Sequence, residues 1–158
     1  MEAVARRAGS GKAAIYRRWP SKEAMTIDLI VQVSVTAADT PDTGTLRGDV
    51  RAYLTATDEM LRHPLVSRIL PDLLAAGAYH PNIAATLRDE ISEGRRRKVG
   101  DILRRAVERG ELPADADLEL GLDFIAGPLY WGTAIRQAPA DPDRLERLTD
   151  KIIAALAA

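Results

Sequence analysis

The chain has 158 residues, of which 46% are hydrophobic and 28% charged, so it can build one or two small domains with a proper core and is not expected to be disordered. It has no cysteine, which excludes disulfides and thiolate metal sites and is compatible with a reducing cytoplasm. We find no charged-then-apolar leader and no apolar run of about 20 residues, so the sequence predicts a cytoplasmic protein without a membrane span.

The small net charge of -1 hides an uneven distribution along the chain. The first 37 residues carry six basic and three acidic side chains, and the remainder is net acidic. A basic N-terminal segment on an acidic body is typical of proteins that bind nucleic acid through one part and are regulated through another.

Two short helices are predicted in this basic segment. The first covers residues 2–8 and ends at Gly9, which can supply the left-handed backbone that closes a helix. The second covers residues 12–19, with Ile15 and Trp19 four residues apart on its inner face. Its outer face is cationic, aromatic and otherwise small, as a helix that enters the major groove of DNA requires. The outer residues are Lys12, Ala13, Ala14, Tyr16, Arg17 and Arg18.

The order of residues in this segment resembles the tetracycline-repressor (TetR) family of one-component bacterial regulators. The resemblance is carried by Ala5, Ala8, Gly9, Ile15, Tyr16, Trp19, Ser21, Lys22, Glu23 and Ala24. It implies that Lys22 holds a phosphate of the DNA. It also implies that six positions face the DNA, namely Gly11, Lys12, Ala13, Ala14, Tyr16 and Arg18. Two residues depart from the family pattern, because Ser10 stands where an apolar turn residue is usual and Ala14 where a hydroxyl is common.

The resemblance implies a further helix before residues 2–8, and the sequence begins at Met1 without it. Two helices alone cannot cover the apolar faces of a three-helix unit. We therefore expect sequence upstream of Met1 to supply that helix, whereas its true absence would favour a protein that has lost DNA binding.

Helices are predicted for nearly all of the remaining chain. A break over residues 38–44 separates a head with its connecting helix, residues 1–37, from a ligand-binding and dimerisation domain over residues 45–158. Thr45 can cap the first helix of this body, and the second, over residues 64–78, is expected to bend or break near Pro71. The predicted helices are 21–37, 45–62, 64–78, 81–109, 117–137 and 141–156.

The last two helices predict a two-fold, four-helix interface between two copies of the chain, with a monomer as the alternative. The expected interface residues are Leu118, Leu122, Ile125, Leu129, Leu145, Leu148, Ile152 and Leu156. The opposite flank of residues 117–137 carries Phe124, Trp131 and Ile135, so this helix is apolar on both sides and both sides need a cover. Gly127-Pro128 interrupts its hydrogen bonding, either as a simple packing kink or where the bundle opens a cavity.

A small apolar ligand is expected within the body. Candidate pocket residues are chosen only because they are apolar or aromatic on inward faces, which also fits plain core packing. They are Tyr53, Met60, Leu73, Tyr79, Ile102, Phe124 and Trp131. The basic run Arg95-Arg96-Arg97-Lys98 is interpreted as a solvated helix face, because Glu90 and Glu93 precede it.

Catalysis is not expected, because the chain has no thiol, no histidine in a nucleophile motif and no glycine-rich phosphate loop. His63 and His80 lack metal-ligand spacing, so no metal and no cofactor are predicted. The sequence thus predicts an all-α, homodimeric, ligand-responsive repressor that binds double-stranded operator DNA and no membrane. The alternative is a homodimeric small-molecule sensor or interaction module that has lost DNA binding.

Overall fold

The fold is all-α, as the sequence predicts. A computed structural model describes residues 1–36, 40–138 and 141–157, and every regular element in these ranges is helical. The elements are α1 (Glu2–Arg7), α2 (Lys12–Arg18), α3 (Lys22–Thr36), α4 (Leu46–Arg62), α5 (Pro64–Gly77), α6 (Pro81–Thr86), η1 (Leu87–Ser92), α7 (Glu93–Glu108), α8 (Leu118–Tyr130), η2 (Trp131–Ile135) and α9 (Pro142–Leu156), where η marks a π-helical segment.

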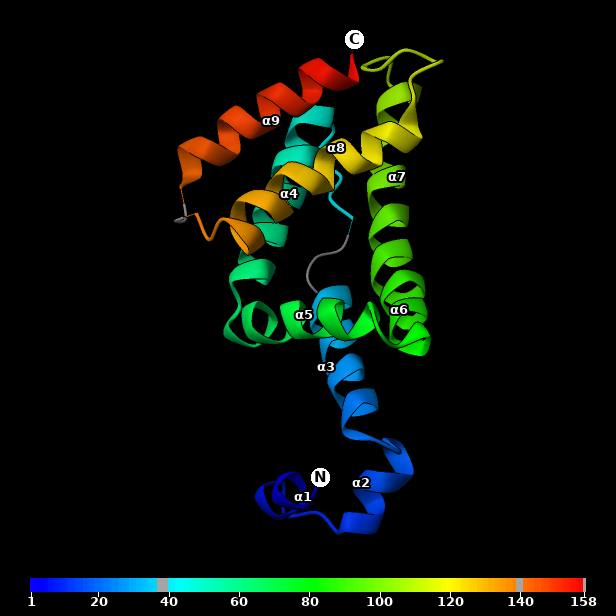
Figure 1. Cartoon of the computed structure of the whole chain (residues 1–158). Coiled ribbons are helices and arrows are strands. Elements are labelled where there is room, and N and C mark those ends of the chain that lie inside the picture. The colour runs from blue at the N-terminus through cyan, green and yellow to red at the C-terminus, as the bar shows by residue number, and fades with distance from the viewer. Residues whose placement is uncertain (37–39, 139–140, 158) are drawn as a thin grey trace.

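The molecule is elongated, with a small head at one end of the connecting helix α3 and a helical body at the other (Figure 1). The N-terminus lies in the head and the C-terminus at the far end of the body. The end expected for the connecting helix at Ala37 and part of the predicted break over residues 38–44 lie outside the described residues. Within the described ranges, no helix is both long and apolar enough to cross a bilayer.

The head is two helices joined by a tight turn. Gly9 has a φ of 61°, so the left-handed residue expected after α1 is present. Ala5 and Ile15 are buried between α1 and α2, at 4% and 8% exposure. Ser21 begins α3, and its hydroxyl accepts a hydrogen bond from the amide of Ala24 at 3.1 Å.

The body packs around α4, whose inner residues Val50 and Leu54 are fully buried. Thr45 caps this helix as expected, because its hydroxyl accepts a hydrogen bond from the amide of Gly48. Helices α7, α8 and α9 surround α4, and α5 with α6 lies across the end of the body nearest α3 (Figure 1). The core is made largely of leucine, isoleucine and valine from α4, α7, α8 and α9.

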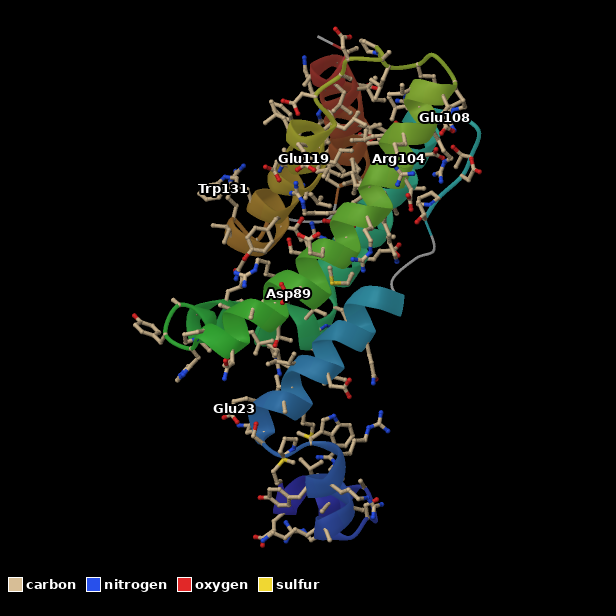
Figure 2. All side chains as sticks on the ribbon, turned by 90° about the vertical axis from the view of Figure 1, so that its right-hand side faces the viewer. Glu23, Asp89, Arg104, Glu108, Glu119 and Trp131 are labelled. Carbon is tan, nitrogen blue, oxygen red and sulfur yellow. The ribbon has the colours of Figure 1, made fainter. Side chains whose placement is uncertain are left out.

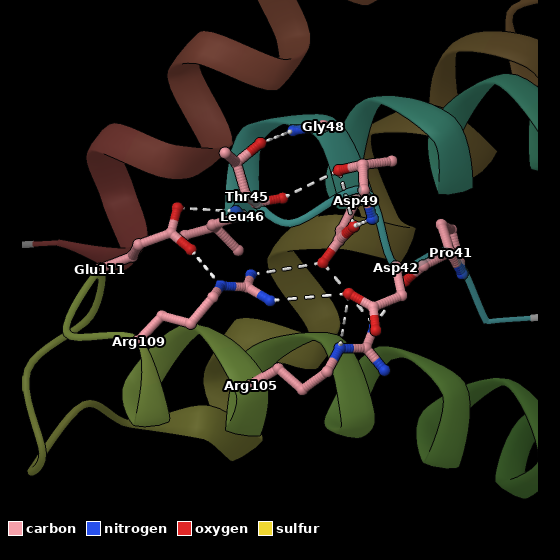
Figure 3. Close-up of polar contacts among 10 residues, drawn as sticks. Pro41, Asp42, Thr45, Leu46, Gly48, Asp49, Arg105, Arg109 and Glu111 are labelled. Carbon is pink, nitrogen blue, oxygen red and sulfur yellow. Dashed lines mark hydrogen bonds and ion pairs between the residues drawn. The ribbon is translucent and has the colours of Figure 1, made fainter.

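A buried carboxylate ties the segment before α4 to α7 (Figure 3). Asp49 is 0% exposed, and its Oδ1 accepts hydrogen bonds from the amide and the hydroxyl of Thr43 at 2.6 and 2.8 Å. Its Oδ2 lies 3.3 Å from the Arg109 guanidinium and 3.6 Å from that of Arg105. Burial alone would raise the pKa of Asp49, but the bonds from Thr43 and the two guanidinium groups hold it below its ordinary value.

Two predicted helices can be compared in detail with the structure. Of the bend or break expected near Pro71, the break is excluded, because α5 is continuous there: proline removes only the bond to the carbonyl of Ser67, and Ser67 is exposed to water. The single helix expected over residues 81–109 contains the π-helical η1, and π-helical η2 follows α8. Insertions of this kind have no signature in the apolar spacing and occur often at functional sites.

Candidate nucleic-acid interface and body cavity

The eight residues predicted to face DNA form one exposed surface, which we call the head surface. All eight are exposed in the structure, whereas Ile15 on the opposite side of α2 is buried. Its residues are Gly11, Lys12, Ala13, Ala14, Tyr16, Arg17, Arg18 and Lys22. The small residues at the start of α2 leave its backbone accessible, and the cations lie around them.

Local contacts orient three side chains of the head surface. The Lys12 ammonium lies 2.6 Å from the Glu2 carboxylate and 6.0 Å from the centre of the Tyr16 ring. The Arg18 guanidinium stacks 4.7 Å from the Trp19 ring, which holds a flexible cation over a rigid plane. Both partners of the Lys12 pair are largely exposed, so water and salt weaken this pair strongly.

The recognition helix α2 is fastened directly to the connecting helix. Trp19 ends α2, and its indole N–H donates a hydrogen bond to Asp28 of α3 at 2.8 Å. A polar contact as well as the short chain connection therefore links α2 to α3.

The body contains a cavity of about 480 Å³, which we call the main cavity. A volume of this size suits a drug-sized molecule. The wall is chiefly apolar and comes from α4, α5, η1, α7 and α8. The lining residues are Thr57, Met60, Leu61, Leu70, Leu74, Leu87, Ser92, Arg95, Asp123, Ala126, Gly127 and Tyr130. Gly127 in this wall precedes Pro128, at the interruption that the sequence offered as a place for a cavity.

A smaller cavity of about 130 Å³ adjoins the main cavity and shares Ser92, Arg95, Asp123 and Ala126 with it. We call it the side cavity. Tyr53 closes it from α4, and the Tyr53 hydroxyl is buried without a hydrogen-bond partner. In the main cavity, burial raises the pKa of the Tyr130 phenol, so Tyr130 stays a neutral hydrogen-bond donor over the ordinary pH range.

The structure brings together only some of the residues expected to bind a ligand. Met60 lines the main cavity and Tyr53 the side cavity, whereas Leu73 and Ile102 are buried in the core and line neither. Tyr79 is 83% exposed near the end of α5, and Phe124 and Trp131 are 41% and 60% exposed on the outer side of α8 and η2. Trp131 projects outward from the body (Figure 2). Phe124 and Trp131 therefore do not flank this cavity, because the helix turns them to its outer side.

Sequence reasoning missed Arg95 as a cavity residue. The run 95–98 is a solvated face only in part, because Arg95 lines both cavities and Arg96 forms ion pairs with Glu119 and Asp123. The available signal was helical spacing, since Arg95 lies four and seven residues before the buried Val99 and Ile102 and so shares their face.

The residues expected at a dimer interface are also placed differently. Ile125 and Leu129 are 0% exposed, and Leu122, Leu145 and Ile152 are at most 8% exposed, because α8 and α9 use this stripe to close the core of a single chain. Leu118, Leu148 and Leu156 are half-buried against the same core. The exposed apolar residues lie on the other side of α8 and η2, which we call the open α8 face: Leu120, Phe124, Trp131 and Ile135.

Among the described residues, no group of three histidine, aspartate or glutamate side chains is placed to hold a metal ion. The fold and site thus define a helical chain with an exposed basic recognition helix on a cavity-containing body.

Comparison with known proteins gives the class. Residues 1–29 match the model for bacterial regulatory proteins of the TetR family, and residues 40–152 match the model for a tetracyclin repressor-like C-terminal domain. The chain belongs to the TetR family of transcriptional regulators, and its relatives are regulators, not enzymes.

Several individual relatives can be aligned with most of this chain. The DNA-binding transcriptional repressor TetR of Mycobacteroides abscessus is 30% identical, with 99% of this chain and 82% of the relative covered. The uncharacterized regulator Rv1556 of Mycobacterium tuberculosis is 29% identical, with 97% and 75% covered. The crystal structure of the regulator SCO0332 is 29% identical with a TM-score of 0.81, covering 99% of this chain and 86% of that one. The uncharacterized regulator YdeS of Bacillus subtilis is 28% identical, and the chain spans 66% of its length.

Proposed function

We propose that the protein is a homodimeric repressor that leaves its operator DNA when a small, mainly apolar molecule enters the main cavity. The observation that carries DNA binding is the head surface, where eight exposed residues, four of them cationic, cover one side of α2 and the start of α3. Cations at such a surface bind phosphates, and the small residues let the helix approach base edges.

The open α8 face supports the dimer. Leu120, Phe124, Trp131 and Ile135 are separated by four, seven and four residues, so they form one stripe along α8 and η2. All four are between 41% and 60% exposed, which is unusual for a contiguous apolar stripe of a monomer. We assign this stripe to a second copy of the chain, related by a two-fold axis that would also pair the two heads for two half-sites.

The position of the main cavity supports control by a ligand. Leu70 and Leu74 of α5 and Leu87 of η1 line the cavity, and both elements also contact α3. A molecule that spreads α5 and η1 would shift α3 and, through Trp19 and Asp28, the recognition helix. Such a ligand weakens operator binding to the extent that it prefers the shifted state. The names of two relatives support repression and control by a ligand. One is named a DNA-binding transcriptional repressor, and the other, FrrA, a flavonoid-responsive regulator. FrrA is 22% identical, with a TM-score of 0.70 and 99% of this chain covered.

Selection from a random double-stranded DNA library by the full-length protein tests the proposal. We expect one enriched sequence with two-fold related half-sites whose centres lie about 34 Å, one helical turn, or a multiple of that apart. Removing the Tyr16 ring and the Arg18 guanidinium together should abolish the enrichment. An intact dimer that enriches no sequence would instead indicate the sensor or interaction module that has lost DNA binding.

A further inference from the structure

The main cavity contains a cation that its apolar lining does not explain. Arg95 reaches the wall from α7, and its Nη2 lies 3.7 Å from the sulfur of Met60. No ion pair joins Arg95 to a carboxylate within the described part of the chain. The neighbouring Arg96, by contrast, pairs with both Glu119 and Asp123. A half-buried guanidinium without a counter-ion favours the approach of an anion.

The side cavity supplies a second unused donor. Tyr53 is 5% exposed, and its hydroxyl has no hydrogen-bond partner. The Tyr53 residue lines the side cavity together with Arg95, so the two residues border the same space. Buried hydroxyl groups are nearly always paired in folded proteins, so an unpaired one at a cavity points to a partner that arrives with a ligand.

The charged residues that line the two cavities carry a net positive charge. The linings contain two guanidinium groups, Arg95 and Arg96, and one carboxylate, Asp123. The Asp123 oxygen already accepts a hydrogen bond from Arg96 at 3.0 Å, so the positive charge of Arg95 is left over. The remaining polar groups are neutral donors or acceptors: Thr57, Ser92, Tyr53 and Tyr130.

We infer that the effector of this protein is an organic acid, with an apolar body in the main cavity and one anionic group held by the Arg95 guanidinium and the Tyr53 hydroxyl. The inference rests on the proposed ligand-controlled function and adds the chemical class of the ligand. Apolar molecules without an acidic group fit the walls but leave both donors unpaired, so they bind more weakly.

Calorimetry with a matched pair of probes tests the inference on the full-length protein. Biphenylcarboxylate and biphenylcarboxamide have the same shape and differ in the charge of the head group. We expect the acid to bind at least about tenfold more tightly than the amide, the effect of one charge-assisted hydrogen bond. In Arg95→Gln the preference should fall below about twofold, while Arg95→Lys should keep part of it.

Control variants distinguish an effect of the proposed binding site from an effect of the overall charge of the protein. Arg97→Gln removes a guanidinium from the same helix that lines neither cavity, so the preference should stay unchanged. Tyr53→Phe should weaken the acid a few-fold and leave the amide unchanged, and the ligand-free variant should melt no lower than the parent because an unpaired hydroxyl is lost. Melting curves of every variant check that it is folded.

Three results would overturn the inference: equal binding of the two probes, an acid preference that survives Arg95→Gln, or no binding of either probe. The experiments distinguish failure of the inference from failure of the proposed function. If both probes bind equally and release operator DNA, the repressor proposal stands and the acid class is wrong. If the acid is preferred but no operator is enriched, the binding site stands and the repressor proposal falls.

Discussion

Lys22 lies at the start of α3, exposed, at the edge of the head surface. We predict that Lys22 meets a phosphate, which every DNA sequence presents. Lys22→Ala should therefore weaken binding to operator and random DNA by the same factor and reduce the slope of log affinity against log salt by about one unit. Titrations at several salt concentrations measure both, and a loss confined to the operator would contradict the phosphate role.

Lys12 occupies the first turn of α2, close to where base edges would lie. Lys12→Ala should lower operator affinity more than random-DNA affinity, by roughly 1–3 kcal/mol of discrimination. Glu2 holds the same ammonium at 2.6 Å, so Glu2→Gln should strengthen binding to both DNAs by removing a competing carboxylate. Competition assays with operator and random duplexes decide the point, and equal losses for Lys12→Ala would place Lys12 on phosphate instead.

At the residue scale, the sequence predicts which side chains are exposed when a helix has a single apolar face. The head-surface residues follow the outer face of α2 because Ile15 fixes the inner one. The sequence did not predict Arg95 at a cavity, and it placed Phe124 and Trp131 at the main cavity, which neither residue lines. The side of a helix that meets a given cavity depends on how neighbouring helices are placed. The unpaired Tyr53 hydroxyl has no sequence signal, because hydrogen-bond partners come from three-dimensional contacts.

At the scale of elements, the Asp49 cluster anchors the segment before α4 to α7 (Figure 3). Asp49→Asn should lower the free energy of unfolding by roughly 1–3 kcal/mol, because Arg105 and Arg109 lose a buried charge partner. Asp42→Asn is the matched control: its carboxylate is 64% exposed and lies 3.8 and 3.9 Å from the same arginines, so its loss should have little effect.

The same cluster predicts the direction of acid sensitivity. The pKa of Asp49 is lower in the folded protein than its ordinary value near 3.8, so the carboxylate stabilises the fold above that pH. The stability is lost as pH falls through the lowered folded pKa, below about pH 4. Urea unfolding between pH 7 and pH 3 should show a smaller acid-induced loss for Asp49→Asn than for the parent, and parallel curves would contradict this.

The order of the helices can be predicted from the sequence, because the residues that start and end a helix act on the backbone next to them. Thr45 marks a helix start and Gly9 a helix end that the structure shows, and Gly9 has a φ of 61°. The π-helical η1 and η2 could not be predicted in this way, since they arise where a helix adjusts its register to neighbouring elements. Pro71 does not break α5, because helices tolerate a proline whose freed carbonyl reaches water.

At the scale of the molecule, the open α8 face should control assembly. Trp131→Glu or Phe124→Glu would place a carboxylate in an apolar two-fold contact, costing several kcal/mol in the dimer, so both variants should sediment as monomers. Their melting should stay cooperative, because neither side chain is buried within one chain. Tyr79→Glu, at an exposed aromatic away from α8, should remain dimeric. Light scattering that shows dimers for all three would place the interface elsewhere.

The sequence favoured a dimer through the last two helices but chose the stripe that closes the core of one chain. Both flanks of α8 are apolar, and only the packing of α8 against α4 and α7 shows which one is already covered. The family could be recognised from the head alone, since its motif depends on residue order over one short segment.

The length of the connecting helix α3 enlarges small movements of the body at the head. With 15 residues, α3 is about 22 Å long, and the recognition helix is attached at one end while α5 and η1 contact it from the body. A tilt of about 5° at the body moves the far end by about 2 Å. In the proposed two-fold dimer the heads move in opposite directions, so their separation changes by about 4 Å against a groove repeat of about 34 Å. A small tilt of α3 at the body is thus enlarged at the DNA, because the length of α3 acts as a lever arm.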